Sequence, residues 1–202
     1  RDLRMSRGLG DVYKRQLPLI VPHLICYSFT KSRKMIDADA ERHSFVVKKT
    51  DKKILRVAYL LIFQKEFRNL FYYRLGRWSV FLRYLPKRST LYINVPYGKI
   101  GGGLVIQHGF STIITAESIG KNCWINQQVT IGYNDSKTYG YGKPVIGDYV
   151  RISAGAKVIG PIKIGNNSTV GCNAVISKSL PENTVVVPSP MRIIREDGAK
   201  TS

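Results

Sequence analysis

Aliphatic residues recur every six positions in the second half of the chain, and this is the strongest pattern in the sequence. The uninterrupted run is Ile146, Ile152, Val158, Ile164, Val170 and Ile176. An earlier run is Ile113, Ile119, Ile125 and Ile131, preceded by Ile100 and Ile106 with one residue inserted. Glycine commonly follows the aliphatic residue. Such regular self-similarity predicts a solenoid in which each repeat stacks on its neighbours.

A period of six fits a short strand, a tight turn and the next strand, so that three repeats close one coil of a three-sided prism. The aliphatic side chain should point inward and stack on its equivalent one coil away. Glycine and asparagine should supply the unusual backbone geometry of the turns. The phased hexads predict about four coils from Ile100 onward. A β-sandwich would instead show a period of two and no fixed glycine offset.

The first half of the chain has a helical pattern. Apolar residues recur at spacings of three and four in two groups: Ile54, Val57, Ala58, Leu61 and Ile62, then Phe67, Leu70, Phe71 and Leu75. Pro86 ends this pattern. We therefore expect a mainly β protein with a basic helical segment over residues 17–92, a parallel β-helix domain over 93–192 and a tail over 193–202.

Residues 1–16 stand apart from both halves. Ser6 to Gln16 (S-R-G-L-G-D-V-Y-K-R-Q) resemble the translation of a transposase-based sequencing-library adaptor over eleven consecutive residues. We expect residues 1–16 to be a sequencing artefact, which is set aside before the fold is considered.

The chain is strongly basic, with 32 Lys and Arg against 13 Asp and Glu and a formal charge of +19. Such a charge favours anionic partners. Arg68, Arg74, Arg77 and Arg83 stand among aromatic residues, which suits either a solvated helical face or a surface that contacts membrane headgroups or an anionic polymer. Nucleic-acid binding would rest on charge alone, because no recognition motif is present, and it is not expected.

Neither a membrane-spanning helix nor a metal site is expected. The longest apolar run, Leu17 to Cys26, is much shorter than the ~20 residues that a spanning helix needs. Cys26, Cys123 and Cys172 are an odd number at wide spacing with no C-x-x-C pair. These features favour a reduced, cytoplasmic setting, with peripheral contact at the inner face of the membrane left open. Cys123 should pack inward as a small hydrophobe.

Two features are candidates for a functional site. The repeat breaks between Ile131 and Ile146, so Tyr133 to Lys143 should form a loop, which is either a binding element or a tolerated insertion. Within the repeat region, His108 is the only histidine, and it should face outward beside a turn. A lone histidine is more often structural than catalytic. Transfer of an acyl group from a thioester to a hydroxyl, however, requires a base near neutral pH, and imidazole suits that role.

Four motifs between Ile100 and Arg192 resemble the serine acetyltransferase-like branch of the hexapeptide-repeat acyltransferases. They are I-G-G-G-L-V-I-Q-H, I-G-K-N-C-W-I-N-Q-Q-V-T-I-G, K-P-V-I-G-D-Y-V-R-I-S-A-G-A-K-V-I-G and I-G-N-N-S-T-V-G-C-N-A-V-I. Each motif is weak alone, but together they are specific. The upstream F-R-N-L-F-Y-Y-R-L-G is similar to the helical preface of members found with bacterial polysaccharide genes.

This resemblance implies a left-handed parallel β-helix, a homotrimer and acetyl-CoA as co-substrate in the groove between adjacent β-helices, with no metal. His108 matches the family's catalytic base. The positions that match cofactor contacts are Tyr133, Ala154 and Cys172, with Lys157 and Lys178 available to phosphates. Gln107 and Lys143 stand where the family has residues that bind the acceptor.

The sequence also departs from the serine-specific pattern. Gly142 and Lys143 replace an arginine and a second histidine, and Gln107 replaces an acidic residue. The aspartate that would orient the base falls near Ile93 and Asn94. The expected activity is therefore O-acetyl transfer to a small hydroxyl acceptor, either a sugar or glycan precursor or L-serine. The alternative is a catalytically idle scaffold or binding module in cell-envelope polysaccharide assembly.

Overall fold

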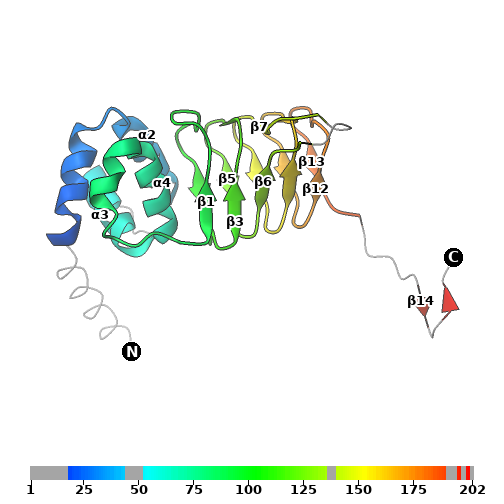
Figure 1. Ribbon diagram of the computed structural model, residues 1–202, viewed down its shortest axis with the longest axis horizontal. Coiled ribbons are helices and arrows are strands. Elements are labelled where there is room, and N and C mark those ends of the chain that lie inside the picture. Colours follow the sequence, from blue (N-terminus) through cyan, green and yellow to red (C-terminus); the bar gives the residue numbers. More distant parts are fainter. Residues whose placement is uncertain (1–17, 44–51, 136–139, 190–194, 197–198, 201–202) are drawn as a thin grey trace.

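In the computed structural model, a helical unit lies at one end of a three-sided parallel β-helix (Figure 1). The structure describes residues 18–43, 52–135, 140–189, 195–196 and 199–200. The segment attributed to an adaptor, residues 1–16, lies outside the described residues, as does Tyr139 of the loop. Within the described residues, none of the helices is both long enough and apolar enough to cross a membrane.

The helical unit packs its apolar stripes against one another. Its elements are a helix over residues 18–29, α2 (Arg33–Arg42), α3 (Lys53–Phe63), α4 (Lys65–Leu75) and the 3-10 helix η2 (Gly76–Leu82). Val57 and Leu61 of α3 meet Phe67 and Phe71 of α4 in one buried cluster. Gly76, at a φ of 57°, ends α4 because that backbone conformation is readily adopted by glycine. The predicted helical pattern therefore forms helices.

Short strands make the three sides of the prism, and every strand pair within it is parallel. The first sheet is β1 (Leu91–Ile93), β3 (Thr112–Ile114), β6 (Thr130–Gly132), β9 (Lys157–Ile159) and β12 (Val175–Ile176). The second sheet is β2 (Val105–Ile106), β5 (Trp124–Ile125), β8 (Arg151–Ile152), β11 (Thr169–Val170) and β13 (Val185–Val186). The third sheet is β4 (Ser118–Ile119), β7 (Val145–Ile146) and β10 (Lys163–Ile164), extended by bridges at Ile100 and Leu180.

The prism has one more level than the hexad count predicted. Two of its sheets contain five strands each, against about four coils expected from Ile100 onward. The additional level comes from outside the hexads that were counted: β1 starts at Leu91, two residues before the predicted start of the β-helix domain, and β13 follows Ile176. Beyond the prism, β14 (Arg195–Glu196) and β15 (Ala199–Lys200) pair antiparallel.

Aliphatic stacking inside the prism follows the predicted period, with one shift. Ile106, Ile125 and Ile152 stand at equivalent positions of successive strands and are buried. In the first sheet, however, Ile114 rather than the predicted Ile113 points inward, since Ile114 is 0% exposed and Ile113 45%. Ile114 follows Ile106 by eight residues and precedes Ile119 by five, so the repeat that holds His108 is two residues longer than the period and the next is one residue shorter. The prediction for Ile113 was therefore wrong by one position.

Glycine and asparagine have separate roles in the turns. The glycines that follow the aliphatic residue allow close approach between coils: a Cβ on Gly101 would lie 2.7 Å from the backbone of Gly120. Left-handed backbone conformation is found instead at residues such as Asn122 and Asn167, with φ of 57° and 56°. Asparagine tolerates that conformation better than most side chains do. The regular spacing of glycine thus reflects coil-to-coil contact more than turn geometry.

Candidate functional site

His108 lies in the turn that joins β2 to β3, at the level of the prism nearest the helical unit. Its side chain is exposed, as predicted. Its φ is 58°, and Ser111 in the same turn has a φ of 51°. Other turn residues of the prism, such as Asn122 and Tyr149, have the same conformation, so the positive φ belongs to the geometry of the coils. Gln107 beside it is anchored, because its Oε1 accepts a hydrogen bond from the Trp124 indole at 3.2 Å.

His108 lines a pocket of about 380 Å³ between the prism and the start of α4. One wall is Ile106, Gln107 and His108, and the other comprises His43, Phe63, Gln64, Lys65, Glu66 and Arg88. Its size falls within the range of small-molecule sites. The helical unit therefore contributes polar side chains to the surroundings of the candidate base.

Glu66 brings a carboxylate into this pocket. Its Oε1 lies 2.7 Å from Nε of Arg88, and the Glu66 side chain is only 7% exposed while that of Arg88 is 36% exposed. A Cβ on Gly109, the residue after His108, would lie 3.0 Å from Cγ of Glu66. The acidic side chain thus packs directly against the turn that carries the candidate base.

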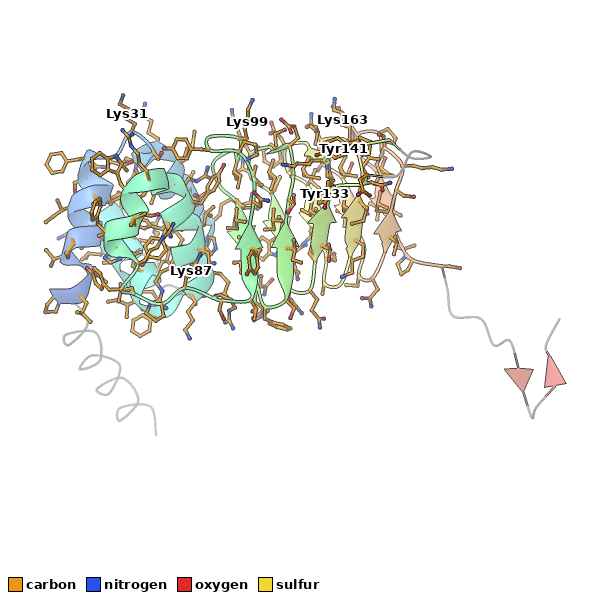
Figure 2. The ribbon with its side chains drawn as sticks, in the orientation of Figure 1. Lys31, Lys87, Lys99, Tyr133, Tyr141 and Lys163 are labelled. Carbon is orange, nitrogen blue, oxygen red and sulfur yellow. The ribbon has the colours of Figure 1, made fainter. Side chains whose placement is uncertain are left out.

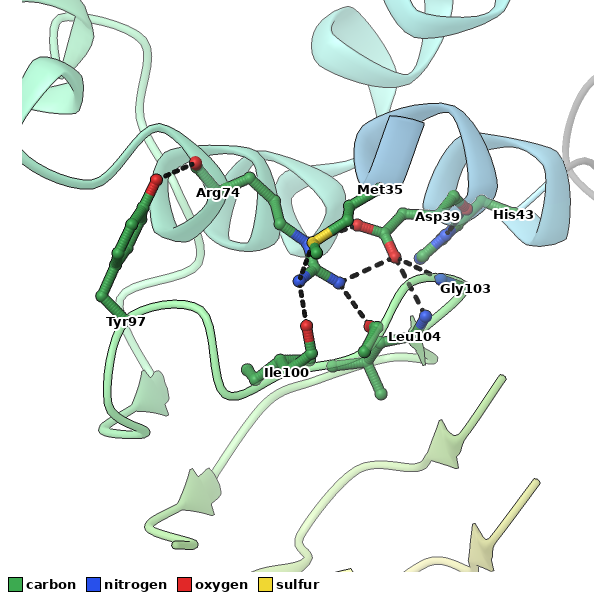
Figure 3. Close-up of polar contacts among 9 residues, drawn as sticks. Met35, Asp39, His43, Arg74, Tyr97, Ile100, Gly103 and Leu104 are labelled. Carbon is green, nitrogen blue, oxygen red and sulfur yellow. Dashed lines mark hydrogen bonds and ion pairs between the residues drawn. The ribbon is translucent and has the colours of Figure 1, made fainter. Parts of the chain in front are cut away.

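A buried ion pair holds α4 and α2 against the first coil (Figure 3). Arg74 Nε donates to Asp39 at 2.9 Å, and its guanidinium also donates to the carbonyl oxygens of Ile100 and Gly101. Asp39 accepts the backbone N–H groups of Gly103 and Leu104 at 2.8 and 3.0 Å. Both side chains are almost fully buried. This cluster fixes the helical unit, and with it the Glu66 wall of the pocket.

The structure corrects one prediction about the basic residues. Arg68 and Arg74 are buried, whereas Arg77 and Arg83 are exposed. Arg68 donates to the carbonyl oxygen of Leu61 at 3.1 Å. Neither a solvated face nor a headgroup-binding surface therefore describes Arg68 and Arg74, because both satisfy polar groups inside the protein.

His43 lies on the far wall of the pocket and is buried. Its Nδ1 is 2.7 Å from the carbonyl oxygen of Asp39. Burial lowers the pKa of His43 to about 4, because desolvation disfavours the charged imidazolium. His43 is therefore neutral near pH 7.

Cys123 is buried as predicted, and burial raises the pKa of its thiol to about 11, which suits an inert packing role.

The residues expected to contact the cofactor lie on two edges of the prism. Ala154 and Cys172 lie in the turns after β8 and β11, on the same edge as His108 but two and three coils away. At ~4.8 Å per coil, Cys172 is roughly 14 Å along that edge. Lys157 begins β9, and its ammonium donates to the carbonyl oxygen of Gln128 at 2.7 Å. It therefore spans two coils of the prism.

Tyr133, Lys143 and Lys178 lie on the other edge, in the turns that lead from the first sheet to the third. Tyr133 and Tyr141 of the loop are both exposed, with ring centroids 6.4 Å apart (Figure 2). The strands of the first sheet separate this edge from His108 within one chain. The structure thus brings Gln107 and His108 together but not the loop residues.

Sequence reasoning missed Glu66 and Arg88. The position predicted for an orienting aspartate, near Asn94, is exposed, and the Asn94 backbone N–H pairs with the carbonyl oxygen of Ile114 at 2.8 Å. Glu66 directly precedes the F-R-N-L-F-Y-Y-R-L-G motif, and this position next to the helical preface could have marked it as a candidate site residue. Its contact with a turn more than forty residues away was visible only in three dimensions. No group of three or more potential metal ligands occurs among the described residues.

The repeat region is similar to hexapeptide-repeat transferases. Residues 143–178 match the family described as bacterial transferase hexapeptide (six repeats). A serine acetyltransferase of Staphylococcus aureus is 43% identical over 106 residues, which cover 52% of this chain and 49% of that protein. The chain spans about half the length of the curated relatives it matches.

Solved structures extend the likeness in fold to the helical unit. The serine acetyltransferase of Neisseria gonorrhoeae in complex with serine aligns over 93% of this chain and 75% of its own, with a TM-score of 0.60 and 23% identity. A serine acetyltransferase in complex with CoA aligns over 81% and 71%, with a TM-score of 0.57 and 22% identity. These neighbours have the left-handed β-helix fold. The predicted fold class and the predicted resemblance to the serine acetyltransferase-like branch are confirmed.

Proposed function

From a repeat region that resembles serine acetyltransferases, we propose that this protein is an acetyl-CoA-dependent O-acetyltransferase with His108 as its general base. The acceptor is a small molecule with a hydroxyl group, either a sugar or glycan precursor or L-serine. The observation that carries this proposal is the placement of His108: an exposed imidazole that lines a pocket together with further polar side chains.

In the proposed reaction, the His108 imidazole takes the proton from the acceptor hydroxyl. The resulting alkoxide attacks the thioester carbonyl, so a carbon–oxygen bond forms and the carbon–sulfur bond breaks. Backbone N–H groups stabilise the oxyanion, and the imidazolium then protonates the departing CoA thiolate. Protons and charge balance without a metal or a covalent enzyme intermediate.

Acetyl-CoA would lie along the edge that carries His108, against Ala154 and Cys172. Lys157 would approach its phosphates from the same copy. Lys178, Tyr133 and Lys143 lie on another edge of the prism, so they would reach the phosphates, the thioester or the acceptor from a second copy. Because the loop residues and His108 occupy different edges of one prism, a complete site needs the loop of a second copy. A homotrimer would supply it. The CoA complex of one such neighbour supports the cofactor.

The test is acetyl transfer by the purified protein and by a His108→Ala variant. Free CoA release is measured with L-serine and a panel of sugars as acceptors. Loss of a positioned general base should lower kcat by about 100-fold or more. His108→Asn serves as a second variant, because asparagine also adopts the left-handed conformation at this turn. Equal turnover in all three proteins would contradict the mechanism, and absence of turnover with intact CoA binding would favour an idle scaffold.

We further propose a cytoplasmic location with peripheral contact between the helical unit and an anionic membrane surface. Phe29, Trp78 and Phe81 are exposed large apolar residues of this unit, and the Arg77 guanidinium lies 5.8 Å from the Trp78 ring centroid. Lys31 also projects from the helical unit (Figure 2). Aromatic side chains beside cations suit the headgroup region. Sedimentation with anionic but not neutral vesicles, weakened by Trp78→Ala, is the expected result.

A further inference from the structure

We propose that the pocket between α4 and the His108 turn is the acceptor site, and that the Glu66–Arg88 ion pair selects a polyhydroxylated acceptor over a free amino acid. This inference rests on the proposed acetyl transfer, whose acceptor class it narrows to a sugar. Glu66 and Arg88 would contact the acceptor, while His108 acts on its hydroxyl.

The geometry places this ion pair beside the candidate base. Glu66 packs against Gly109, the residue that follows His108. A Cβ added to Gly109 would lie 3.0 Å from Cγ of Glu66. Glu66, Arg88 and His108 all line the same pocket. A small molecule held by the pair would therefore present its neighbouring groups to the imidazole.

The chemistry of the pair favours hydroxyl groups. A carboxylate offers about four acceptor sites, and a guanidinium offers five donors. Arg88 Nε and Glu66 Oε1 form an ion pair at 2.7 Å, but their alignment is not that of a hydrogen bond, so the contact between them is electrostatic. A sugar carries hydroxyls that both donate and accept, so it can donate to Glu66 and accept from Arg88 while the ion pair stays closed. Hydrogen bonds to charged groups are stronger than neutral ones.

A free amino acid faces a different situation. Its ammonium would compete with Arg88 for Glu66, and its carboxylate would compete with Glu66 for Arg88. To bind the zwitterion, Glu66, which is only 7% exposed, would have to exchange the guanidinium for an ammonium. Arg88 is 36% exposed, so the pair is partly buried, and the cost of this exchange is the loss of its 2.7 Å contact. The arrangement therefore disfavours a zwitterion and tolerates a polyol.

The residues around the pair fit a sugar as well. Phe63 gives the pocket an apolar wall, and Gln64 and Gln107 add amide groups that donate and accept hydrogen bonds. Ligand pockets typically combine an apolar surface with a few placed polar groups. The hydrogen bond from the Trp124 indole, at 3.2 Å, already orients Gln107. Its amide nitrogen can therefore donate to the molecule that receives the acetyl group.

The experiment compares Glu66→Gln, which removes the charge and keeps the shape, with Glu41→Gln, the same change at an exposed position of α2. Steady-state kinetics are measured with acetyl-CoA and a panel of free monosaccharides, methyl glycosides and L-serine. For the best sugar we expect Glu66→Gln to raise KM for the acceptor about tenfold or more, with KM for acetyl-CoA unchanged. Glu41→Gln should match the unaltered protein.

Every other outcome either supports or contradicts the acceptor site proposed for this pocket. Equal acceptor KM in Glu66→Gln and the unaltered protein, or L-serine as the preferred acceptor, would overturn this inference and leave the proposed acetyl transfer standing. If no acceptor is acetylated, the proposed function fails, and the pocket is then tested by calorimetric titration of the same sugars and of L-serine. Sugar binding that is lost in Glu66→Gln would support the pocket. Binding that is unaffected or absent would refute it.

Discussion

The helical unit and the β-helix bury different kinds of side chain. Within the described residues, the buried polar side chains of the β-helix are Thr112 and Ser168. The helical unit buries His23, Asp39, His43, Glu66, Arg68, Asn69, Arg74 and Ser79. One region thus has an almost purely aliphatic core, and the other adds to its apolar core polar contacts that occur once.

The difference shows how each region obtains a defined structure. Every coil of the prism repeats the same backbone hydrogen bonds to the next, as in Gly101 to Ile119 and Gly120 to Ile146, so stability is spread over equivalent levels. In the helical unit, Asp39 and Arg74 hold α2, α4 and the first coil at a single point. Loss of one partner there leaves the other buried without its countercharge.

The largest expected effect is that of Arg74→Met on the helical unit. Removing one partner of a buried ion pair should cost about 3–5 kcal/mol, because Asp39 remains desolvated. Chemical denaturation and hydrogen exchange would measure this, with faster exchange in α2 and α4 than in β8. Arg77→Met, at an exposed position of η2, should change stability by about 0.5 kcal/mol or less. Equal effects of the two variants would contradict the role of the pair.

A smaller effect is expected in the prism, where two adjacent isoleucines form a matched pair. Ile114→Ala should cost about 2–4 kcal/mol because it leaves a cavity in the aliphatic stack. Ile113→Ala should cost about 1 kcal/mol or less, since that side chain is already partly in water. Thermal unfolding of both variants measures the difference. The opposite order would show that the strand is shifted by one residue.

The smallest expected effect of a single side chain is the loss of stability that one buried histidine of the helical unit causes in mild acid. His23 and His43 have pKa values lowered to about 4 by burial. Between pH 6.5 and 4 the unfolded chain binds more protons at these residues than the folded one, so stability falls as the pH falls. At pH 5 the loss for His43 is about 2 kcal/mol. Free energies of unfolding at pH 7 and 5 measure it, and a flat profile would refute it.

Much of the fold could be predicted because the repeat leaves the same signal at every level. The side chains of Ile125, Ile152 and Val170 point into the prism, because a period of six places equivalent residues on the same, inward face of successive coils. The error at Ile113 arose where one inserted residue left two adjacent isoleucines as candidates. The exposure of His108 was predicted, whereas the burial of Arg68 and Arg74 was not. The sequence alone does not show which groups will surround a charged side chain.

By itself, the sequence determined the period of the prism, the order of helices before strands and the single histidine of the repeat, because these depend on local spacing and composition. Only the tertiary structure decided that Glu66 and Arg88 accompany His108 and that Asp39 and Arg74 join the two regions. Those contacts link residues that are distant in the chain. Their energies come from burial and pairing, which exist only once the helical unit packs on the first coil.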